Sequence, residues 1–243
     1  MVERVERIDV RALAREIEVG LRGRADPERQ EVTRGYFPSA LEILGVSAGD
    51  LREVIRDFRD RWRPLAPESV IELARALHHG GIHEVRQAGY EILEMRKDAR
   101  ALLDRKTLEA LGAGNDNWAS VDTFATRVAG PAWRRRQVGD AVLREWAASD
   151  DRWWRRTAVV CTVALNTRAR GGSGDTARTL DLCARLTAAD DPMVAKGVSW
   201  ALRSLVWHDP EAVRDFIDAH ENELPALVKR EVRTKLETGR KNR

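Results

Sequence analysis

A tryptophan and an aspartate stand four residues apart in the segment Asn-Trp-Ala-Ser-Val-Asp, at Trp118 and Asp122. On a helix, residues at this spacing project from the same face, one turn apart. A fixed carboxylate there can stabilise a developing positive charge and can position or deprotonate a water molecule. The π face of a neighbouring indole tolerates a cationic group. The alternative is that Asp122 only stabilises the first turn of its helix, as acidic residues there commonly do.

Basic residues are concentrated in the middle of the chain. Residues 111–180 contain 11 Lys and Arg against 7 Asp and Glu, whereas residues 1–110 contain 20 against 21. A local basic excess suits a surface that binds phosphates, because neutralising them releases condensed counterions. Arginine supplies 36 of the 42 basic residues. Its planar fork suits phosphate, but a genome that favours arginine codons would produce the same excess.

We expect helices to position these residues. Charged residues make up 33% of the chain and are spread along nearly every segment. That distribution is typical of amphipathic helices with one solvated face. Asp50 and Pro67 each precede an apolar-periodic run, and residues 111–117 read as a loop before a helix that starts near Trp118. Asp209-Pro210 predicts the start of the next-to-last helix, and Pro225 the start of the last.

Other segments carry expectations of their own. We expect an N-terminal helix within residues 1–25 and a flexible, exposed loop over residues 168–175. Gly130-Pro131 predicts a break in the chain, followed by one helix over residues 132–148. The whole chain, residues 1–243, is interpreted as a single domain of helical repeats.

The helices follow a weak internal repeat. Asp150-Asp151 and the helix after them align with Asp190-Asp191 and its helix, 40 residues later. The alignment places Arg156 and Lys196 at one repeat position, and an earlier copy places Arg86 there. Helix pairs with this period are typical of HEAT-like units, which stack into a curved solenoid. We therefore expect an all-helical solenoid whose concave face carries these basic residues toward a long, charged partner such as duplex DNA.

Four of the eight tryptophans are interpreted as core residues that pack between helices, as large aromatic side chains usually are. This group comprises Trp62, Trp133, Trp146 and Trp207. Cys161 and Cys183 do not have the spacing of a metal site and are expected to be small buried residues. No stretch approaches the roughly 20 apolar residues of a membrane span, and the charged N-terminus lacks the apolar segment of a signal peptide.

Six segments resemble, in family order, blocks of the AlkD-type DNA alkylation repair glycosylases. They are Tyr36 before ALEILGV, then HEVRQAGYEIL, NWASVD, DRWWRRTAVV, VAKGVSWALR and VKREVRTKL, over roughly residues 30–240. The resemblance implies a HEAT-like fold that holds duplex DNA in its concave cleft. It also implies hydrolysis of the N-glycosidic bond of cationic N3- and N7-alkylated purines, without cofactor or metal and without base flipping.

The resemblance assigns roles to individual residues. Asp122 would stabilise the oxocarbenium-like sugar and position water, while Trp118 and Trp200 would pack against the deoxyribose. Tyr36 matches a cleft-lining tyrosine, although an N-terminal tyrosine could equally cap the core. Arg156 matches a phosphate-binding arginine, and its alternative is an ion pair on a solvated face. Arg155 and Arg203 are neighbouring candidates for phosphate contacts.

One position departs from the family pattern, since many members carry an acidic residue where this chain has Ala119. A catalytically silent DNA-binding protein therefore remains an alternative to the glycosylase, as does a HEAT-like scaffold for protein interactions. No lysine lies near Trp118, so a Schiff-base lyase step is not expected. We expect a monomer in the bacterial cytosol, without a membrane segment, whose partner is alkylated duplex DNA. Bulky adducts would be accepted, because no pocket for the base is needed.

Overall fold

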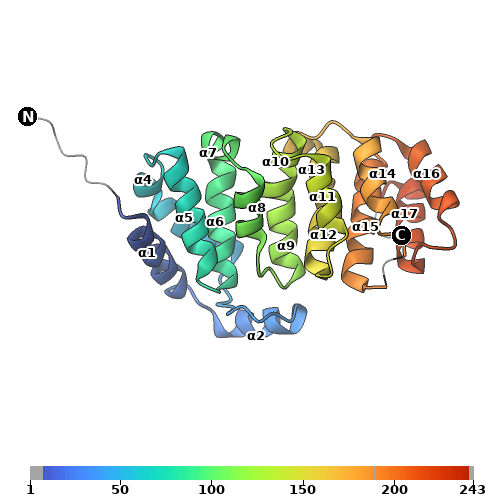
Figure 1. The fold of residues 1–243 in the computed structure, drawn as a ribbon. Coiled ribbons are helices and arrows are strands. Elements are labelled where there is room, and N and C mark those ends of the chain that lie inside the picture. Colours follow the sequence, from blue (N-terminus) through green and yellow to red (C-terminus); the bar gives the residue numbers. More distant parts are fainter. Residues whose placement is uncertain (1–7, 189, 241–243) are drawn as a thin grey trace, which may run out of the picture. The chain divides into compact units, whose positions relative to one another are not determined.

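The chain folds entirely into helices and loops in the part described by the structure, a computed structural model covering residues 8–188 and 190–240 (Figure 1). Within those ranges no strand forms, and a single isolated bridge joins Glu42 to Ile82. The all-helical class expected from the sequence is confirmed. The chain divides into two compact units, Met1–Ser120 and Val121–Arg243.

The first unit is built around α5 and α6, which pack against each other. Its helices are α1 (Val10–Arg22), α2 (Pro27–Tyr36), α3 (Ala48–Asp57), α4 (Arg59–Trp62), α5 (Pro67–His79), α6 (His83–Met95), α7 (Lys97–Ala101) and α8 (Arg105–Gly112). Gly89 favours close packing of α5 on α6, because a Cβ there would lie only 3.1 Å from the carbonyl oxygen of Ala74. α1 packs against α5 and α3, so one apolar core holds the unit together.

The boundary between the units falls within α9 (Trp118–Phe124). The second unit continues with η1 (Ala125–Ala129), α10 (Gly130–Arg134), α11 (Asp140–Ala147), α12 (Arg152–Cys161), α13 (Val163–Asn166), η2 (Arg168–Arg170), α14 (Thr176–Ala184), α15 (Pro192–Leu205), α16 (Pro210–Ala219) and α17 (Ala226–Thr238). α12 packs against α11 and α15, and α15 packs in turn against α14 and α17.

Helix pairs recur along the chain. The second helices of successive pairs, α6, α9, α12, α15 and α17, begin at residues 83, 118, 152, 192 and 226, so their starts are 34 to 40 residues apart. The 40-residue step from α12 to α15 is visible in their caps, because Asp151 and Asp191 each accept a backbone hydrogen bond from the second residue of the following helix. Aspartate at this position satisfies backbone N–H groups that the helix leaves unpaired. The internal repeat predicted from the sequence is therefore present in these helices.

The interpretation of Gly130-Pro131 as a break is wrong. Both residues belong to α10, which continues directly from the π-helical turn η1. Proline has no N–H to place, and π-bulges accommodate such irregularities inside a helical run. Gly130 is needed for packing, because a Cβ there would lie 2.7 Å from the carbonyl oxygen of Cys161. The expected helix over 132–148 is also two elements, since α10 ends at Arg134 and Arg136 adopts a left-handed conformation with φ of 63°.

The N-terminal helix lies within residues 1–25, as expected, and part of the segment 168–175 is held by hydrogen bonds. The N-terminal helix α1 begins after its cap Asp9, and residues 1–7 lie outside the described part of the chain. Residues 168–175 begin with the short helix η2, and their glycines are held by backbone hydrogen bonds. The N–H of Gly172 donates to the carbonyl of Thr167, and that of Gly174 donates to Leu165. The segment is therefore tied to α13, although Arg168 is exposed.

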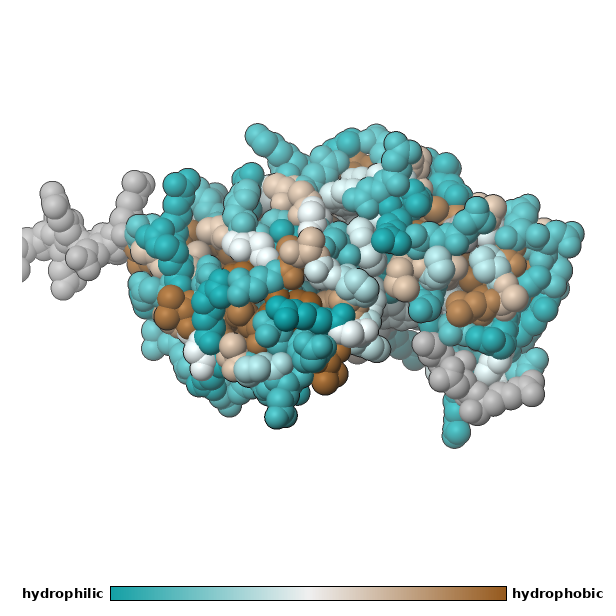
Figure 2. All heavy atoms as spheres, turned by 90° about the horizontal axis from the view of Figure 1, so that it is seen from below, coloured by the Kyte–Doolittle hydropathy of each residue, from teal (hydrophilic) through white to brown (hydrophobic). Residues whose placement is uncertain are grey.

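The core contains most of the aromatic residues assigned to it. Trp62, Trp133 and Trp146 are buried, as are Cys161 and Cys183, whose thiol pKa values are raised by burial. Trp207 was also expected in the core, but it lies in the turn after α15 and 67% of it is exposed. In the face shown in Figure 2, hydrophilic side chains predominate and hydrophobic residues form separate patches.

Candidate functional site

The start of α9 is fixed by polar contacts within the first unit. Asn117 is fully buried, and its side-chain oxygen accepts a hydrogen bond of 2.9 Å from the backbone N–H of Ser120. The carboxylate of Asp116 accepts hydrogen bonds from the hydroxyl of Ser39 and the N–H of Ala40. The loop after α2 is thereby attached to the first turn of α9, which carries Trp118.

Trp118 forms an aromatic cluster with two residues from the end of α2. Its ring centroid lies 5.2 Å from that of Tyr36 and 5.8 Å from that of Phe37, both in edge-on geometry. Phe37 is buried, whereas Tyr36 is 71% exposed. Because Tyr36 is so exposed, it does not cap the core, and the alternative left open by the sequence is excluded. The structure brings Tyr36 and Trp118 together at the surface of the first unit.

Arg86 holds the loop that precedes α9. Its guanidinium is buried and donates to the carbonyl of Gly114 at 2.7 Å and to that of His78 at 3.1 Å. Burial lowers the pKa of Arg86 and also that of His78, to about 4. The repeat pattern predicted that Arg86 would present its charge to a partner. The structure shows that it does not. Its partners are backbone carbonyls of α5 and of the loop before α9, so Arg86 joins these two segments.

Asp122 is paired with Arg156 in the second unit. The Nε and Nη2 atoms of Arg156 donate to the two carboxylate oxygens at 2.9 and 2.8 Å, and its Nη1 donates to the backbone carbonyl of Met193. The side chains are only 6% and 16% exposed for Arg156 and Asp122. Burial raises the pKa of the Asp122 carboxyl, and the hydrogen bonds from Arg156 offset that effect only in part.

This geometry selects between two interpretations of Asp122. The carboxylate does not cap its own helix, because Asn117 does so. It is instead a fixed, partly desolvated group of the kind that electrostatic stabilisation requires. Arg156 forms an ion pair, but the pair is buried and does not lie on a solvated face as the alternative supposed. Binding of a phosphate by Arg156 stays a prediction.

Trp200 lies on α15, the helix that also contacts Arg156. Met193, Gly197 and Trp200 follow one another at intervals of four and three residues, which places them on the same face of the helix. α12 and α15 meet at Gly197, where a Cβ would lie 2.9 Å from a methyl carbon of Val159. Trp200 is half-buried two turns beyond Met193. The contacts thus run from Asp122 through Arg156 to the helix face that carries Trp200.

The remaining basic candidates differ in what they contact. Arg155 donates from Nη1 to the carbonyls of Ser149 and Asp150, at 2.7 and 2.8 Å, and so holds the loop before α12. Arg203 donates to the hydroxyl of Ser199 at 3.1 Å and lies 3.5 Å from the carboxylate of Glu231. Lys196, at the repeat position of Arg156, is exposed.

Comparisons with known proteins identify a family and a similar fold. A family model described as "DNA alkylation repair enzyme" matches residues 17–236. The chain belongs to the DNA alkylation repair enzyme family. Among solved structures, it resembles a predicted DNA alkylation repair enzyme from Enterococcus faecalis, with a TM-score of 0.72 and 15% sequence identity. That match covers 88% of this chain and 98% of the other, and it supports the helical fold. A search of curated proteins finds no match.

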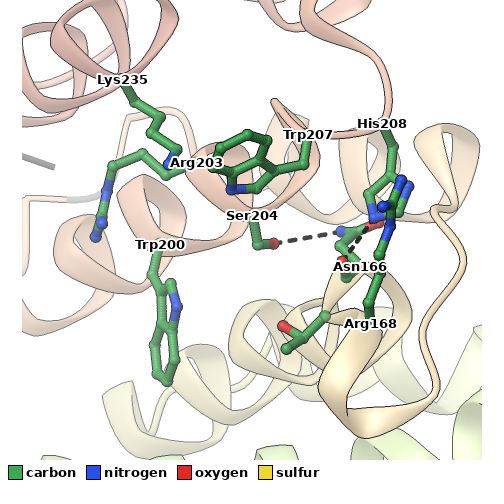
Figure 3. A pocket seen from close by; sticks show the side chains of 9 residues that line it. Asn166, Arg168, Trp200, Arg203, Ser204, Trp207, His208 and Lys235 are labelled. Carbon is green, nitrogen blue, oxygen red and sulfur yellow. Dashed lines mark hydrogen bonds between the residues drawn. The ribbon is translucent and has the colours of Figure 1, made fainter. Parts of the chain in front are cut away.

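Within this family fold, sequence reasoning missed one group of residues. Trp207 and Lys235 join Trp200 and Arg203 in lining a cavity of the second unit (Figure 3). A signal was present, because Trp200, Ser204 and Trp207 recur at intervals of four and three residues and so share one helical face. The assignment of Trp207 to the core obscured it.

Neither a metal centre nor a membrane span is found in the described ranges. In residues 8–188 and 190–240, no three His, Cys, Asp or Glu side chains gather in a way that could hold a metal ion. No helix in those ranges is both long and apolar enough to cross a bilayer.

Proposed function

We propose that the protein is a monofunctional DNA glycosylase that removes cationic N3- and N7-alkylated purines from duplex DNA, acting as a monomer in the cytosol. The observation that carries this proposal is the Asp122 carboxylate of the second unit, fixed by Arg156 through two hydrogen bonds and largely removed from solvent. A role in alkylation repair follows from the family. The bond that is hydrolysed and the lesion are those implied by the resemblance to the AlkD-type glycosylases, and the chemistry of the site is compatible with them.

The proposed reaction breaks the bond between C1′ of the deoxyribose and the purine nitrogen. The bonding electron pair leaves with the base, which is already cationic and becomes neutral, so no strong general acid is needed. Positive charge develops on the sugar, and a fixed carboxylate lowers the energy of that charge. Water then attacks C1′ and releases a proton. Because burial raises the pKa of Asp122, the carboxylate is a better acceptor for that proton than an ordinary aspartate.

The aromatic residues would act on the sugar and on access of water. We propose that Trp118 and Trp200 pack against the deoxyribose, and that the exposed Tyr36 contacts the strand beside Trp118. None of these groups requires the base to leave the stack, so bulky adducts would be accepted. Arg155, Arg156 and Arg203 are proposed as backbone contacts.

The test is product analysis on duplex DNA that contains 7-methylguanine. Wild-type protein should release the free base and leave an abasic site, without cutting the strand. Asp122→Asn should slow release about 100-fold or more, whereas Asp181→Asn should not. Asp181 is a matched control, because it accepts a 2.8 Å hydrogen bond from Arg144 on the surface of α14. Wild-type protein that binds DNA but releases no base would instead identify a catalytically silent binding protein.

A further inference from the structure

The second unit contains a cavity of about 450 Å³ whose lining is cationic and aromatic (Figure 3). It is lined by residues from the end of α13, η2, α15 and α17, namely Asn166, Thr167, Arg168, Trp200, Arg203, Ser204, Trp207, His208 and Lys235. None of these nine described residues is acidic. Its volume lies within the range typical of small-molecule sites, about 300 to 1,000 Å³.

Positive charge and an exposed aromatic surface are adjacent in this cavity. The ammonium of Lys235 lies 4.1 Å from the ring centroid of Trp207, which is 67% exposed. Arg203 lies on the same side of the cavity, and Arg168 with His208 on the other (Figure 3). Burial lowers the pKa of Lys235, and the charge of Arg203 lowers it further. Arg203 is also 3.5 Å from the carboxylate of Glu231, whereas the ammonium of Lys235 would be stabilised by a bound anion.

Fixed hydrogen bonds support the wall opposite Lys235. The side-chain N–H₂ group of Asn166 donates to the hydroxyls of Thr179 at 2.9 Å and Ser204 at 3.4 Å. His208 contacts the backbone carbonyl of Asn166 through Nε2 at 2.7 Å. Because that carbonyl can only accept, Nε2 carries the proton. The cavity is thus built on ordered side chains, as a preformed site requires.

We propose that this cavity binds one nucleoside phosphate unit, with its base against the indole of Trp207 and its phosphate beside Lys235 and Arg203. A nucleotide combines a flat aromatic ring with an anion at short distance. Since Lys235 lies over one face of the Trp207 indole, the base would stack on the other face while the phosphate approaches the ammonium. Stacking on an aromatic side chain tolerates any base, and a guanidinium fork suits phosphate oxygens. The nucleotide could belong to a DNA strand, unpaired from its complement, or be free in solution.

Binding is measured first with deoxyadenosine 5′-monophosphate by calorimetry. Wild-type protein should bind it, and Trp207→Ala and Lys235→Ala should each weaken binding about 10-fold, as stacking and charge contacts of this kind predict. The matched control is Trp153→Ala, because Trp153 also has a cation over its ring, Arg152 at 5.2 Å, but lies outside the cavity. That variant should bind as the wild type does.

Two further probes identify the chemistry and the source. Inorganic phosphate and deoxyadenosine should each bind more weakly than the nucleotide. An undamaged duplex with one unpaired adenine, compared with a fully paired duplex, tests the strand as the source. If Trp207→Ala weakens binding of the duplex with the unpaired base as well as that of the nucleotide, the occupant is part of a strand. If it weakens only the free nucleotide, the occupant is the mononucleotide.

Equal binding of phosphate and nucleotide, or no effect of Trp207→Ala on any probe, would overturn the proposal. Since no probe contains an alkylated base, this outcome is independent of the proposed glycosylase activity.

Discussion

Asp122 on α9 and Arg156 on α12 are 34 residues apart in sequence, yet they form a two-point ion pair that is almost entirely removed from solvent. In such a pair the guanidinium fixes both carboxylate oxygens at once, which a lysine could not do. Arg156 is fixed in turn by the carbonyl of Met193. The orientation of the proposed catalytic carboxylate is therefore set by two neighbouring helices.

Removing Arg156 should destabilise the protein as well as lower its activity. Arg156→Ala leaves the Asp122 carboxylate buried without its partner, which typically costs about 3 kcal/mol or more. Urea denaturation measures that loss. Arg156→Lys should recover part of the stability but less of the activity, because it cannot hold both oxygens. A variant Arg156→Ala as stable as the wild type would show that the pair does not hold Asp122 in place.

On acidification, base release should be lost at a higher pH than it would be if the catalytic aspartate had an ordinary pKa. Asp122 acts as an anion, and burial raises its pKa, so protonation removes the charge as the pH falls through that raised value. Single-turnover base release as a function of pH measures this acid limb. Arg156→Gln should move the limb to higher pH, because Arg156 lowers the pKa of Asp122. An unchanged limb in that variant would contradict the assignment.

His78 should make the first unit sensitive to acid. Its folded-state pKa is about 4, below the ordinary 6.5. A group whose pKa is lowered by folding stabilises the fold above its unfolded pKa, and that stabilisation is lost as pH falls from 6.5 through 4. By pH 4.5 the loss should be about 2 to 3 kcal/mol. His78→Gln should show a smaller decrease between pH 7 and 4.5, while His79→Gln, at an exposed position, should behave like the wild type.

Gly130 should tolerate no side chain. A Cβ there would lie 2.6 Å from the carbonyl oxygen of Ala125 and 2.7 Å from that of Cys161, so the backbone itself would have to move. Gly130→Ala should lower the free energy of unfolding by about 2 kcal/mol or more. The control is Gly139→Ala, since a Cβ at Gly139 meets no atom within 4 Å. Equal melting temperatures for the two variants would show that helix packing at Gly130 has room to adjust.

Basic residues at the repeat position should differ in their effect on DNA binding. Lys196 is exposed, so Lys196→Ala should lower the slope of log affinity against log salt by about one. Arg86 is engaged with buried carbonyls, so Arg86→Ala should lower the melting temperature instead. Arg156→Ala tests the remaining prediction, because a phosphate contact would also reduce its slope by about one. A salt slope that is reduced by Arg86→Ala and not by Lys196→Ala would contradict the structure.

The sequence predicted the features that depend on local signals. Helix starts at Pro67, Pro210 and after Asp151 follow from caps and prolines, and the common helix of Trp118 and Asp122 follows from spacing alone. It could not predict which basic residues are buried, because Arg86 and Lys196 have the same side-chain charge and repeat position. Packing decides that Arg86 closes a loop while Lys196 faces solvent. The same limit explains Trp207, since hydrophobicity indicates burial but does not show whether a neighbouring helix covers the residue.

The central claim concerns the carboxylate of Asp122, and one comparison tests it directly. Single-turnover release of 7-methylguanine from a duplex is measured for wild-type protein and Asp122→Asn, together with the affinity of each for an undamaged duplex. A group that acts mainly on the transition state should change the rate and leave binding nearly intact. We expect base release to decrease about 100-fold or more in Asp122→Asn, with smaller losses for Trp118→Ala and Trp200→Ala. Base release at the wild-type rate by a folded Asp122→Asn protein would contradict the proposed mechanism.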